Sequence, residues 1–585
     1  MSRSTPARSR ASRHAPPPRP APGVFRRMIG AAAARPWAVA LAFALAHLAI
    51  VLAALIPTLH SGGDGASYLA LAQSLRDGGG YRELWDPAMR PHTQYPPGFP
   101  LLLAAAMSVG IKPWVGFKVL VAFFSAAAVG FSFLWARRAA GMRAALGVAG
   151  ILAISPGVVD QGRWELSDAP FWAMTMLALW AFACPAPPPS AEKTGGEPRA
   201  PDRRWMAMAA LAAAATLAAY MTRAAGLPLV VGAAAWLAWR RRWTALALLT
   251  AIVAPFGVWW ALRGRALNAP GYAGFLWYVD PYRPALGRVD AAGLLERMWA
   301  NVSIYASSHL PSLVIGWIDG RRALVLGAAL VLLALSGWVM RVRRPGAAEF
   351  WLPLYMGLVL IWPREWAGER FLLPALPVLL VCAAEPVRWA AARMRAPWLA
   401  GAAAALIMLL SVPTLRLEVV DARRCQAAYS PSFTHPCLSP EYTDYLDIAL
   451  EVRGRLPAGS AVLARKPTLF WAESGYRSRV FPFSANPDTL IAAARAAGAR
   501  YVMLDQMDNV SMLYVGPVLI QRPQAFCVMR ALGPARATLL AIVPGAERMP
   551  NLRSRPGDEQ AEVGFRACGP AYWARGRALP PAPPG

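Results

Sequence analysis

The sequence predicts an α-helical protein that crosses a membrane about 11 times and carries a small C-terminal α/β domain outside the membrane. Of its 585 residues, 56% are hydrophobic. Apolar runs of about 20 residues recur along the chain, the length that spans a hydrocarbon core. Arg residues gather at the ends of these runs, where loop charge sets the orientation of a membrane protein. This pattern stops near residue 416.

The N-terminal segment is strongly basic. Residues 1–35 contain eight Arg and no acidic residue, which predicts a disordered cytoplasmic tail. A cleaved signal peptide is the alternative. The apolar run 36–57 is long for such a peptide, and Ala54-Leu55-Ile56-Pro57 is a poor cleavage site, so we favour an uncleaved first span.

The expected transmembrane domain covers residues 36–415, with the N-terminus inside and the C-terminus outside. Arg clusters at 137–138, 240–242, 341–344 and 388–395 fit the inner turns, whereas Arg263 and Arg265 fall outside. A Pro-rich polar linker follows residue 184. The expected spans are 36–57, 113–135, 143–159, 169–184, 205–221, 226–239, 244–262, 322–340, 349–362, 371–387 and 397–415.

A polar loop at 58–112 follows the first span and holds Asp64. Residues 67–75 have the apolar spacing of a short amphipathic helix, and 96–110 are apolar but too short to span. An acid beside a bilayer is costly, which indicates a function for Asp64. An ordinary solvated loop is the alternative.

The other expected outer loops add charged residues at the same membrane surface. An Arg fork binds phosphate oxygens in a bidentate way, and a carboxylate can take the proton of an attacking hydroxyl. The alternatives are an interfacial Arg with its head group in water, an N-cap role for Asp168, and a structural role for the Pro-containing loop. The candidates are Asp64 and Asp168 for catalysis, Arg223 and Arg370 for a donor phosphate, and Tyr95, Pro96, Pro97, Glu165 and Glu369 for the substrate loop.

The C-terminal region, 416–575, is expected to be a periplasmic α/β domain before a disordered tail at 576–585. Short strands are expected at Leu463, 480–481 and 501–504, and helices at 441–455 and 487–498. Four of the six Cys lie here and permit two disulfides in an oxidising compartment. The simplest pairing joins Cys425 to Cys437 and Cys527 to Cys568, and other pairings stay open.

Five segments between residues 36 and 385 follow the first expected span in a characteristic order. They are Asp64-Gly-Ala-Ser-Tyr-Leu, Tyr95-Pro96-Pro97-Gly98-Phe99-Pro100, Asp168, Thr222-Arg223 and Glu369-Arg370-Phe-Leu-Leu-Pro. In this order they resemble the GT-C fold membrane glycosyltransferases, in particular the mannosyltransferase- and aminoarabinose-transferase-like group of family 39. The resemblance implies a polyprenyl-phosphate sugar donor, a catalytic or acceptor-contacting acid after the first span, and donor-phosphate contact by the Arg before Leu-Leu-Pro.

This sequence departs from the family pattern at two positions. Many members have a second acid after the first, where this chain has Gly65. Many also have Lys before the Pro-Pro pair, where this chain has Gln94-Tyr95. The missing Lys removes one expected phosphate contact.

The sequence therefore predicts a glycosyltransferase of the bacterial inner membrane that transfers a hexose or pentose. The donor is a polyprenyl-phosphate sugar, and the acceptor is a glycan, lipid or protein at the periplasmic face. A polytopic transporter or lipid flippase with a periplasmic domain is the alternative, but it should carry charges within its spans. An inactive scaffold of this fold is a third hypothesis.

No cofactor is expected, and no ligand spacing indicates a divalent metal, although a metal requirement stays open. The net charge of +28 could indicate nucleic acid. Only four of the 60 basic residues are Lys, and the Arg residues lie at the ends of apolar runs. We therefore expect a lipid bilayer, and no nucleic acid, as the partner of this charge.

Overall fold

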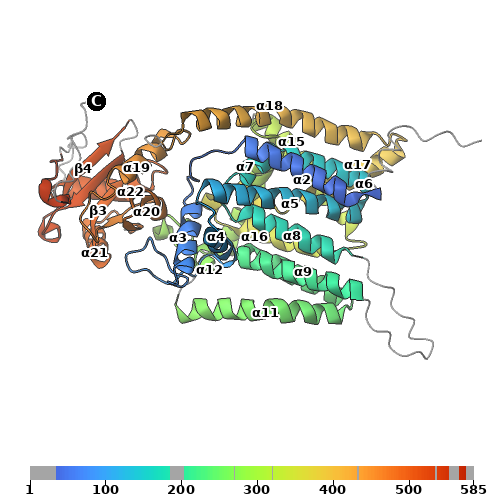
Figure 1. Ribbon diagram of the computed structural model, residues 1–585, viewed down its shortest axis with the longest axis horizontal. Helices are drawn as coiled ribbons and strands as arrows, with labels where there is room; N and C mark the ends of the chain where they lie inside the picture. Colours follow the sequence, from blue (N-terminus) through green and yellow to red (C-terminus); the bar gives the residue numbers. More distant parts are fainter. Residues whose placement is uncertain are drawn as a thin grey trace, which may run out of the picture.

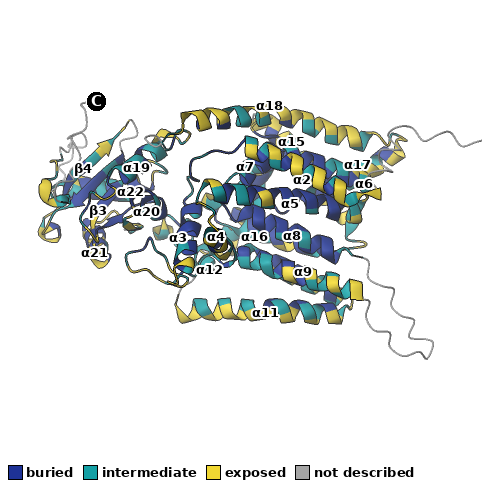
Figure 2. Ribbon diagram, viewed as in Figure 1, coloured by how far each residue is buried: buried dark blue, intermediate teal, exposed yellow. Residues whose placement is uncertain are grey.

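A computed structural model shows a mostly helical bundle with a smaller, sheet-containing domain at one end (Figure 1). The outer faces of helices such as α11 (Trp243–Ala266) and α18 (Leu399–Ala428) are exposed, whereas α8 (Asp168–Phe182) is largely buried (Figure 2). Exposed side chains such as Val258 and Leu409 are apolar, as expected of a lipid-facing surface. The structure describes residues 34–184, 203–268, 271–318, 320–430, 434–533, 537–552 and 565–574.

A helix is present at every position where the sequence predicts a span. Six helices of the described part of the chain are long and apolar enough to cross a membrane, and α6 with α7, bent by 62°, gives a seventh. The exact number of spans therefore stays a prediction. Besides α8, α11 and α18, the helices at the predicted span positions are α2 (Pro36–Ala53), α5 (Val115–Ala140), α6 (Met142–Ile154), α7 (Pro156–Gly162), α9 (Arg203–Thr222), α10 (Leu227–Trp239), α15 (Gly320–Arg341), α16 (Ala347–Ile361) and α17 (Leu376–Arg393).

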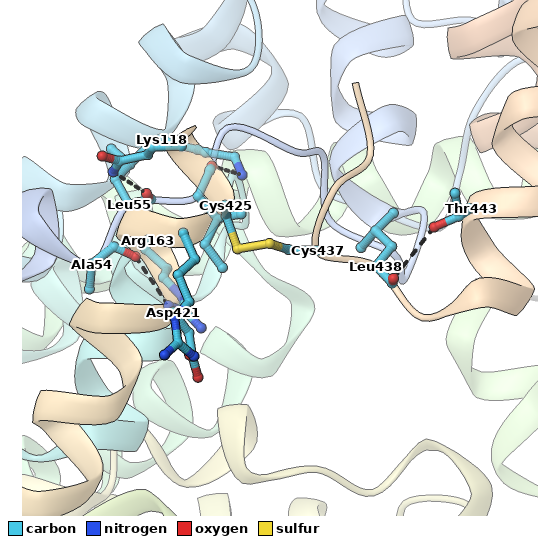
Figure 3. Close-up of a disulfide and its surroundings, with 12 residues drawn as sticks. Ala54, Leu55, Lys118, Arg163, Asp421, Cys425, Cys437, Leu438 and Thr443 are labelled. Atoms are coloured by element: carbon cyan, nitrogen blue, oxygen red, sulfur yellow. Dashed lines mark hydrogen bonds and ion pairs between the residues drawn. A yellow bond between two sulfur atoms is a disulfide. The ribbon is translucent and has the colours of Figure 1, made fainter. Parts of the chain in front are cut away.

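The last helix of the bundle, α18, continues beyond the point where the composition changes. It ends at Ala428, so residue 416 lies inside a helix. Its last turns contact the segment that follows α2: the Gln426 amide donates to the Leu55 carbonyl oxygen at 2.7 Å, and Ala422 packs on Ile56. A disulfide between Cys425 and Cys437 then joins α18 to the C-terminal domain (Figure 3).

Short elements at the domain end of the bundle form the loops that the sequence analysis places outside the membrane, called the outer loops below. The expected helix at 67–75 is α3 (Asp64–Arg76), and the short apolar segment 96–110 contains α4 (Gly98–Ser108). Gly63 precedes α3 with a φ of 87°, a left-handed conformation that glycine adopts without strain. The remaining elements are α12 (Gly271–Leu276), α13 (Ala291–Ile304), the π-helical turn Tyr305–His309, α14 (Leu310–Ile315) and 3-10 turns at Arg364–Trp366 and Glu369–Leu372.

The C-terminal domain is built on one five-stranded sheet in the order β2-β1-β3-β5-β4. Strand β1 is parallel to both of its neighbours, β2 and β3, and β5 is antiparallel to both β3 and β4. The strands are β1 (Ala461–Leu463), β2 (Arg477–Arg479), β3 (Ala499–Leu504), β4 (Phe526–Leu532) and β5 (Ala537–Ile542), and the helices are α19 (Pro440–Glu451), α20 (Pro467–Ser474), α21 (Pro487–Ala496) and α22 (Val510–Gln521).

The sequence analysis located this domain only in part. It identified helices at α19 and α21 and strands at β1 and β3, but it placed β2 at 480–481 and missed β4 and β5. In β4 the apolar pattern is interrupted by Arg530, which forms a two-pronged ion pair with Glu451 of α19. Both expected disulfides are present, the second between Cys527 and Cys568. The expected tails and the Pro-rich linker fall largely or wholly outside the described residues.

The polar loop after α2 packs directly into the C-terminal domain. Leu59 and Ala66 belong to the same hydrophobic cluster as Phe470. The buried carboxylate of Asp86 accepts hydrogen bonds from Arg479 Nε and Nη2 at 2.9 and 2.7 Å. The loop and the domain therefore form one packed unit at the end of the bundle.

We predict that Asp86→Ala lowers the free energy of unfolding by about 3 kcal/mol, because it leaves Arg479 without its buried partner. The denaturation temperature in detergent measures the loss. Asp421→Ala is the control, since Asp421 and its partner Arg424 are both exposed and such pairs contribute less than about 1 kcal/mol. Equal losses in the two variants would show that the Asp86–Arg479 pair does not hold the loop.

Candidate active site

A cavity of about 930 Å³ lies where the outer loops meet the C-terminal domain. One part of its lining is polar and carries residues from α3, the 94–96 loop and the turn at Glu369–Leu372. Another part is apolar and comes from α10 and α16. The polar side chains considered below are Asp64, Tyr68, Tyr95, Arg223, Arg370 and Lys466, and the apolar ones include Leu227, Val231, Leu354 and Leu358.

Asp64 is the first residue of α3, where the helix dipole favours a negative charge. Its Oδ2 lies 2.8 Å from Arg370 Nη1, and its Oδ1 accepts a hydrogen bond from the Tyr95 hydroxyl at 3.0 Å. Burial alone would raise the pKa of Asp64, but Arg370, His60 and the Tyr95 hydroxyl together hold that pKa at about 2. The carboxylate is therefore ionised at neutral pH.

Arg370 extends from the 3-10 turn after α16, and its side chain is 29% exposed. Burial opposes its charge, yet the carboxylates of Asp64 and Asp168 raise the pKa of Arg370 above its ordinary value. Only Nη1 contacts Asp64, so the guanidinium presents further N–H donors toward the cavity. Such a fork suits an anion with several oxygens.

A second pair, Arg223 with Asp168, stands beside the first. Arg223 Nη1 lies 2.6 Å from Asp168 Oδ2 and donates to Ser167 Oγ at 3.2 Å. The Tyr68 hydroxyl is hydrogen-bonded to the same Ser167 Oγ at 2.9 Å. Arg223 lines the cavity, whereas the buried Asp168 is not among the described lining residues. Asp168 thus lies behind Arg223 and holds it.

Glu165 lies away from the cavity and is buried. It accepts a hydrogen bond from the His60 backbone N–H at 2.6 Å, and its Oε2 lies 3.5 Å from Lys118 Nζ. Lys118 also donates to the carbonyl oxygens of Ile56 and Thr58. This group therefore fastens the chain that leads from α2 to Asp64.

Of the expected substrate-loop residues, Tyr95, Pro96 and Glu369 line the cavity. Burial raises the pKa of Glu369, and the Gln161 amide donates to its Oε1 at 3.4 Å. Pro97, which precedes α4, is not among the described lining residues. The sequence analysis missed Tyr68, Tyr272 and Lys466, which do line it. Tyr68 could have been found within the Asp64 segment, whereas Lys466 carries no local signal.

The described residues contain no group of three or more His, Cys, Asp or Glu placed to hold a metal ion. The cavity instead offers guanidinium, ammonium and phenol groups beside a carboxylate. The chemistry that can be derived from the side chains is therefore anion binding and proton transfer.

Residues 91–276 match the model of the dolichyl-phosphate-mannose-protein mannosyltransferase family. The fold is similar to that of ArnT from Cupriavidus metallidurans in the apo state, with a TM-score of 0.50, 16% identity, and coverage of 88% of this chain and 99% of that chain. Together these findings confirm the resemblance to the family-39-like glycosyltransferases of the GT-C fold.

Two further solved structures are similar at slightly lower scores. ArnT from Cupriavidus metallidurans bound to undecaprenyl phosphate has a TM-score of 0.49 and 16% identity, with 88% of this chain and 99% of that chain covered. AglB from Archaeoglobus fulgidus, in complex with an inhibitory peptide and a dolichol-phosphate, has a TM-score of 0.49 and 13% identity, with 86% and 74% covered. No match was found among curated protein sequences.

The low pKa of Asp64 leads to a prediction for stability against pH. A carboxylate whose pKa falls on folding stabilises the folded protein at pH values above the pKa that this carboxylate has in the unfolded chain, about 4 for Asp. For Asp64 this contribution is roughly 2 kcal/mol, and it is lost as the pH falls toward the pKa of the folded state. We expect the stability difference between wild-type protein and Asp64→Asn to be constant from pH 8 to 5 and to fall by roughly half by pH 3.

Thermal unfolding in detergent across this pH range is the measurement. Asp77→Asn, at the exposed end of the same helix, is the matched control and should match wild-type protein at pH 7. A difference between wild-type and Asp64→Asn protein that disappears already at pH 6 would contradict the Asp64–Arg370 pair.

Proposed function

We propose that this chain transfers a sugar from a polyprenyl-phosphate donor to an acceptor at the periplasmic face of the bacterial inner membrane. The observation that carries the proposal is the composition of one cavity. Its polar part holds Asp64, Arg223 and Arg370, and its apolar part is lined by residues of α10 and α16 such as Val231 and Leu358. A lipid with a phosphate head group needs both surfaces.

The donor phosphate is assigned to Arg370 and Arg223. Each guanidinium already has a carboxylate partner, so each is held in place before the donor binds. Guanidinium forks match phosphate oxygens in geometry and charge. Asp168 does not touch the donor in this proposal. It is a positioning residue, because it orients Arg223 from behind.

Asp64 is assigned as the general base. The acceptor hydroxyl attacks the anomeric carbon, its proton passes to the Asp64 carboxylate, and the bond from that carbon to the phosphate oxygen breaks. The lipid phosphate leaves with its negative charge stabilised by the two Arg residues. A single displacement of this kind inverts the anomeric carbon.

Arg370 keeps Asp64 weakly basic, because its guanidinium binds the carboxylate directly. A phosphate on Arg370 would compete for the guanidinium and raise the pKa of Asp64 toward the range useful to a base. Donor binding would therefore prepare the carboxylate for the acceptor. A productive order of addition, with the donor first, follows from this competition.

A transporter or flippase remains the alternative function. Such a protein needs polar groups along a path through the membrane. Here the Asp, Glu and Arg side chains of the cavity come from the beginning of α3 and from turns after α9 and α16, and Lys466 comes from the C-terminal domain, so the charged groups lie at one end of the bundle. This distribution favours a reaction at one membrane surface.

The proposed orientation follows from the Arg residues at the other end of the bundle. Arg341 and Arg388 donate to the carbonyl oxygens of Ala139 and Ala140 at 3.2 and 2.8 Å, so three of the Arg clusters meet there. By the positive-inside rule this end faces the cytoplasm. A reporter that is active only in the periplasm should then be active when fused after Gly585, and a signal from a cytoplasm-only reporter at that site would contradict it.

The central test of the proposed function is Asp64→Asn, which keeps the size of the side chain and removes the base. We expect turnover to fall by about 10²–10⁴-fold at saturating substrates. Purified protein in lipid is offered a panel of polyprenyl-phosphate sugars and acceptors, and release of free lipid phosphate is measured. Asp77→Asn should retain wild-type turnover. Transfer by Asp64→Asn at the wild-type rate would remove Asp64 from the chemistry.

A further inference from the structure

The cavity contains one cation that comes from the C-terminal domain. Lys466 lies between β1 and α20, and among the described lining residues it is the one that this domain contributes. Its Nζ donates to the carbonyl oxygen of Gly62 at 3.3 Å, two residues before Asp64 in the chain. The ammonium group is therefore placed beside the proposed base, although more than 400 residues separate the two in sequence.

The neighbours of Lys466 in the chain fix its position on both sides. Arg465 Nη2 lies 2.5 Å from Asp508 Oδ2, and the Arg465 guanidinium stacks 4.4 Å above the ring of Tyr282. Thr468 Oγ1 donates to the Gly63 carbonyl oxygen at 3.0 Å in a buried contact. Lys466 thus has a backbone held against the bundle and a side chain directed to the cavity.

The charge of Lys466 is not neutralised in the way the Arg charges are. Arg223 and Arg370 each pair with a carboxylate, at 2.6 and 2.8 Å. Across the described part of the chain, no carboxylate lies within ion-pair distance of Lys466 Nζ. Burial and the adjacent Arg465 lower the pKa of Lys466, against the opposing charges of Asp508 and Asp64. A desolvated cation without a carboxylate in direct contact is unfavourable, and an anion in the cavity would relieve this.

We propose that Lys466 is a donor-binding residue whose ammonium group donates to a phosphate oxygen of the lipid-linked substrate. The C-terminal domain then completes the active site and does not merely cover it. This inference rests on the proposed function, because that function supplies the anion. The anion would lie within reach of both Lys466 and Arg370, which line the same cavity.

A purely structural role predicts different behaviour. If Lys466 only docks the domain on Gly62, then loss of its hydrogen bond should resemble loss of the neighbouring Thr468 bond to Gly63. Thr468→Val removes that bond without changing charge. Lys466→Met keeps the apolar stem and removes charge, and Lys466→Arg keeps the charge. Lys112→Met removes an exposed Lys from the loop between α4 and α5 and serves as the charge control.

The probes are undecaprenyl phosphate and the uncharged undecaprenol, titrated against the full-length protein in detergent while tryptophan fluorescence is followed. We expect wild-type protein to prefer the phosphate. Lys466→Met should weaken phosphate binding by about 10-fold, the value of one charge-assisted hydrogen bond, and leave undecaprenol binding unchanged. Lys466→Arg should restore most of the preference, and Thr468→Val and Lys112→Met should keep it.

Wild-type affinity of Lys466→Met for undecaprenyl phosphate would overturn the proposal. So would an equal loss in Thr468→Val, because the effect would then come from docking. If the wild-type protein bound both lipids equally, the donor class of the proposed function would be wrong and this inference with it. A phosphate preference that depends on Lys466 supports the inference even where no sugar of the panel is transferred, so the two failures are distinguishable.

Discussion

The ion pair between Asp64 and Arg370 is the contact on which the rest of the site depends. It joins residues 306 positions apart, one at the start of α3 and the other in the turn after α16. The Tyr95 hydroxyl binds the same carboxylate and so adds the 94–96 loop. Three segments that are far apart in the sequence are thereby brought to one point at the domain end of the bundle. The same pair makes Asp64 a weak base until another anion engages Arg370.

Most of the poorly solvated charged side chains around the Asp64–Arg370 pair have an oppositely charged partner. Arg223 with Asp168 and Lys118 with Glu165 form two further pairs close to the membrane boundary. Burying an unpaired charge costs several kcal/mol, so the carboxylate of each pair offsets the desolvation cost of its cation. Lys466 departs from this pattern, because no carboxylate of the described residues lies within ion-pair distance of its ammonium group, and the proposed phosphate contact rests on this difference.

The C-terminal domain is tied to the bundle by contacts of different kinds. A disulfide holds the end of α18, Asp86 forms an ion pair with Arg479, and Thr468 bonds to the Gly63 carbonyl oxygen. These contacts surround the segment that carries Asp64. The domain consequently shapes the cavity. Its attachment to the bundle must be rigid to keep Lys466 within hydrogen-bonding distance of the Gly62 carbonyl oxygen.

The sequence by itself determined the helical class and the location of the bundle helices, and it selected Asp64, Arg223 and Arg370 as candidate site residues, which the structure places around one cavity. These follow from local features, because the length of an apolar run and a charge at its end are visible without any partner. Only the tertiary structure decided that Asp168 holds Arg223, that Glu165 pairs with Lys118, and that Lys466 enters the cavity. The β4–β5 hairpin was also visible only in the tertiary structure, because the charged Arg530 within β4 is accommodated by its ion pair with Glu451. Which partner a charged side chain takes depends on contacts between distant segments, and a single sequence does not contain those distances.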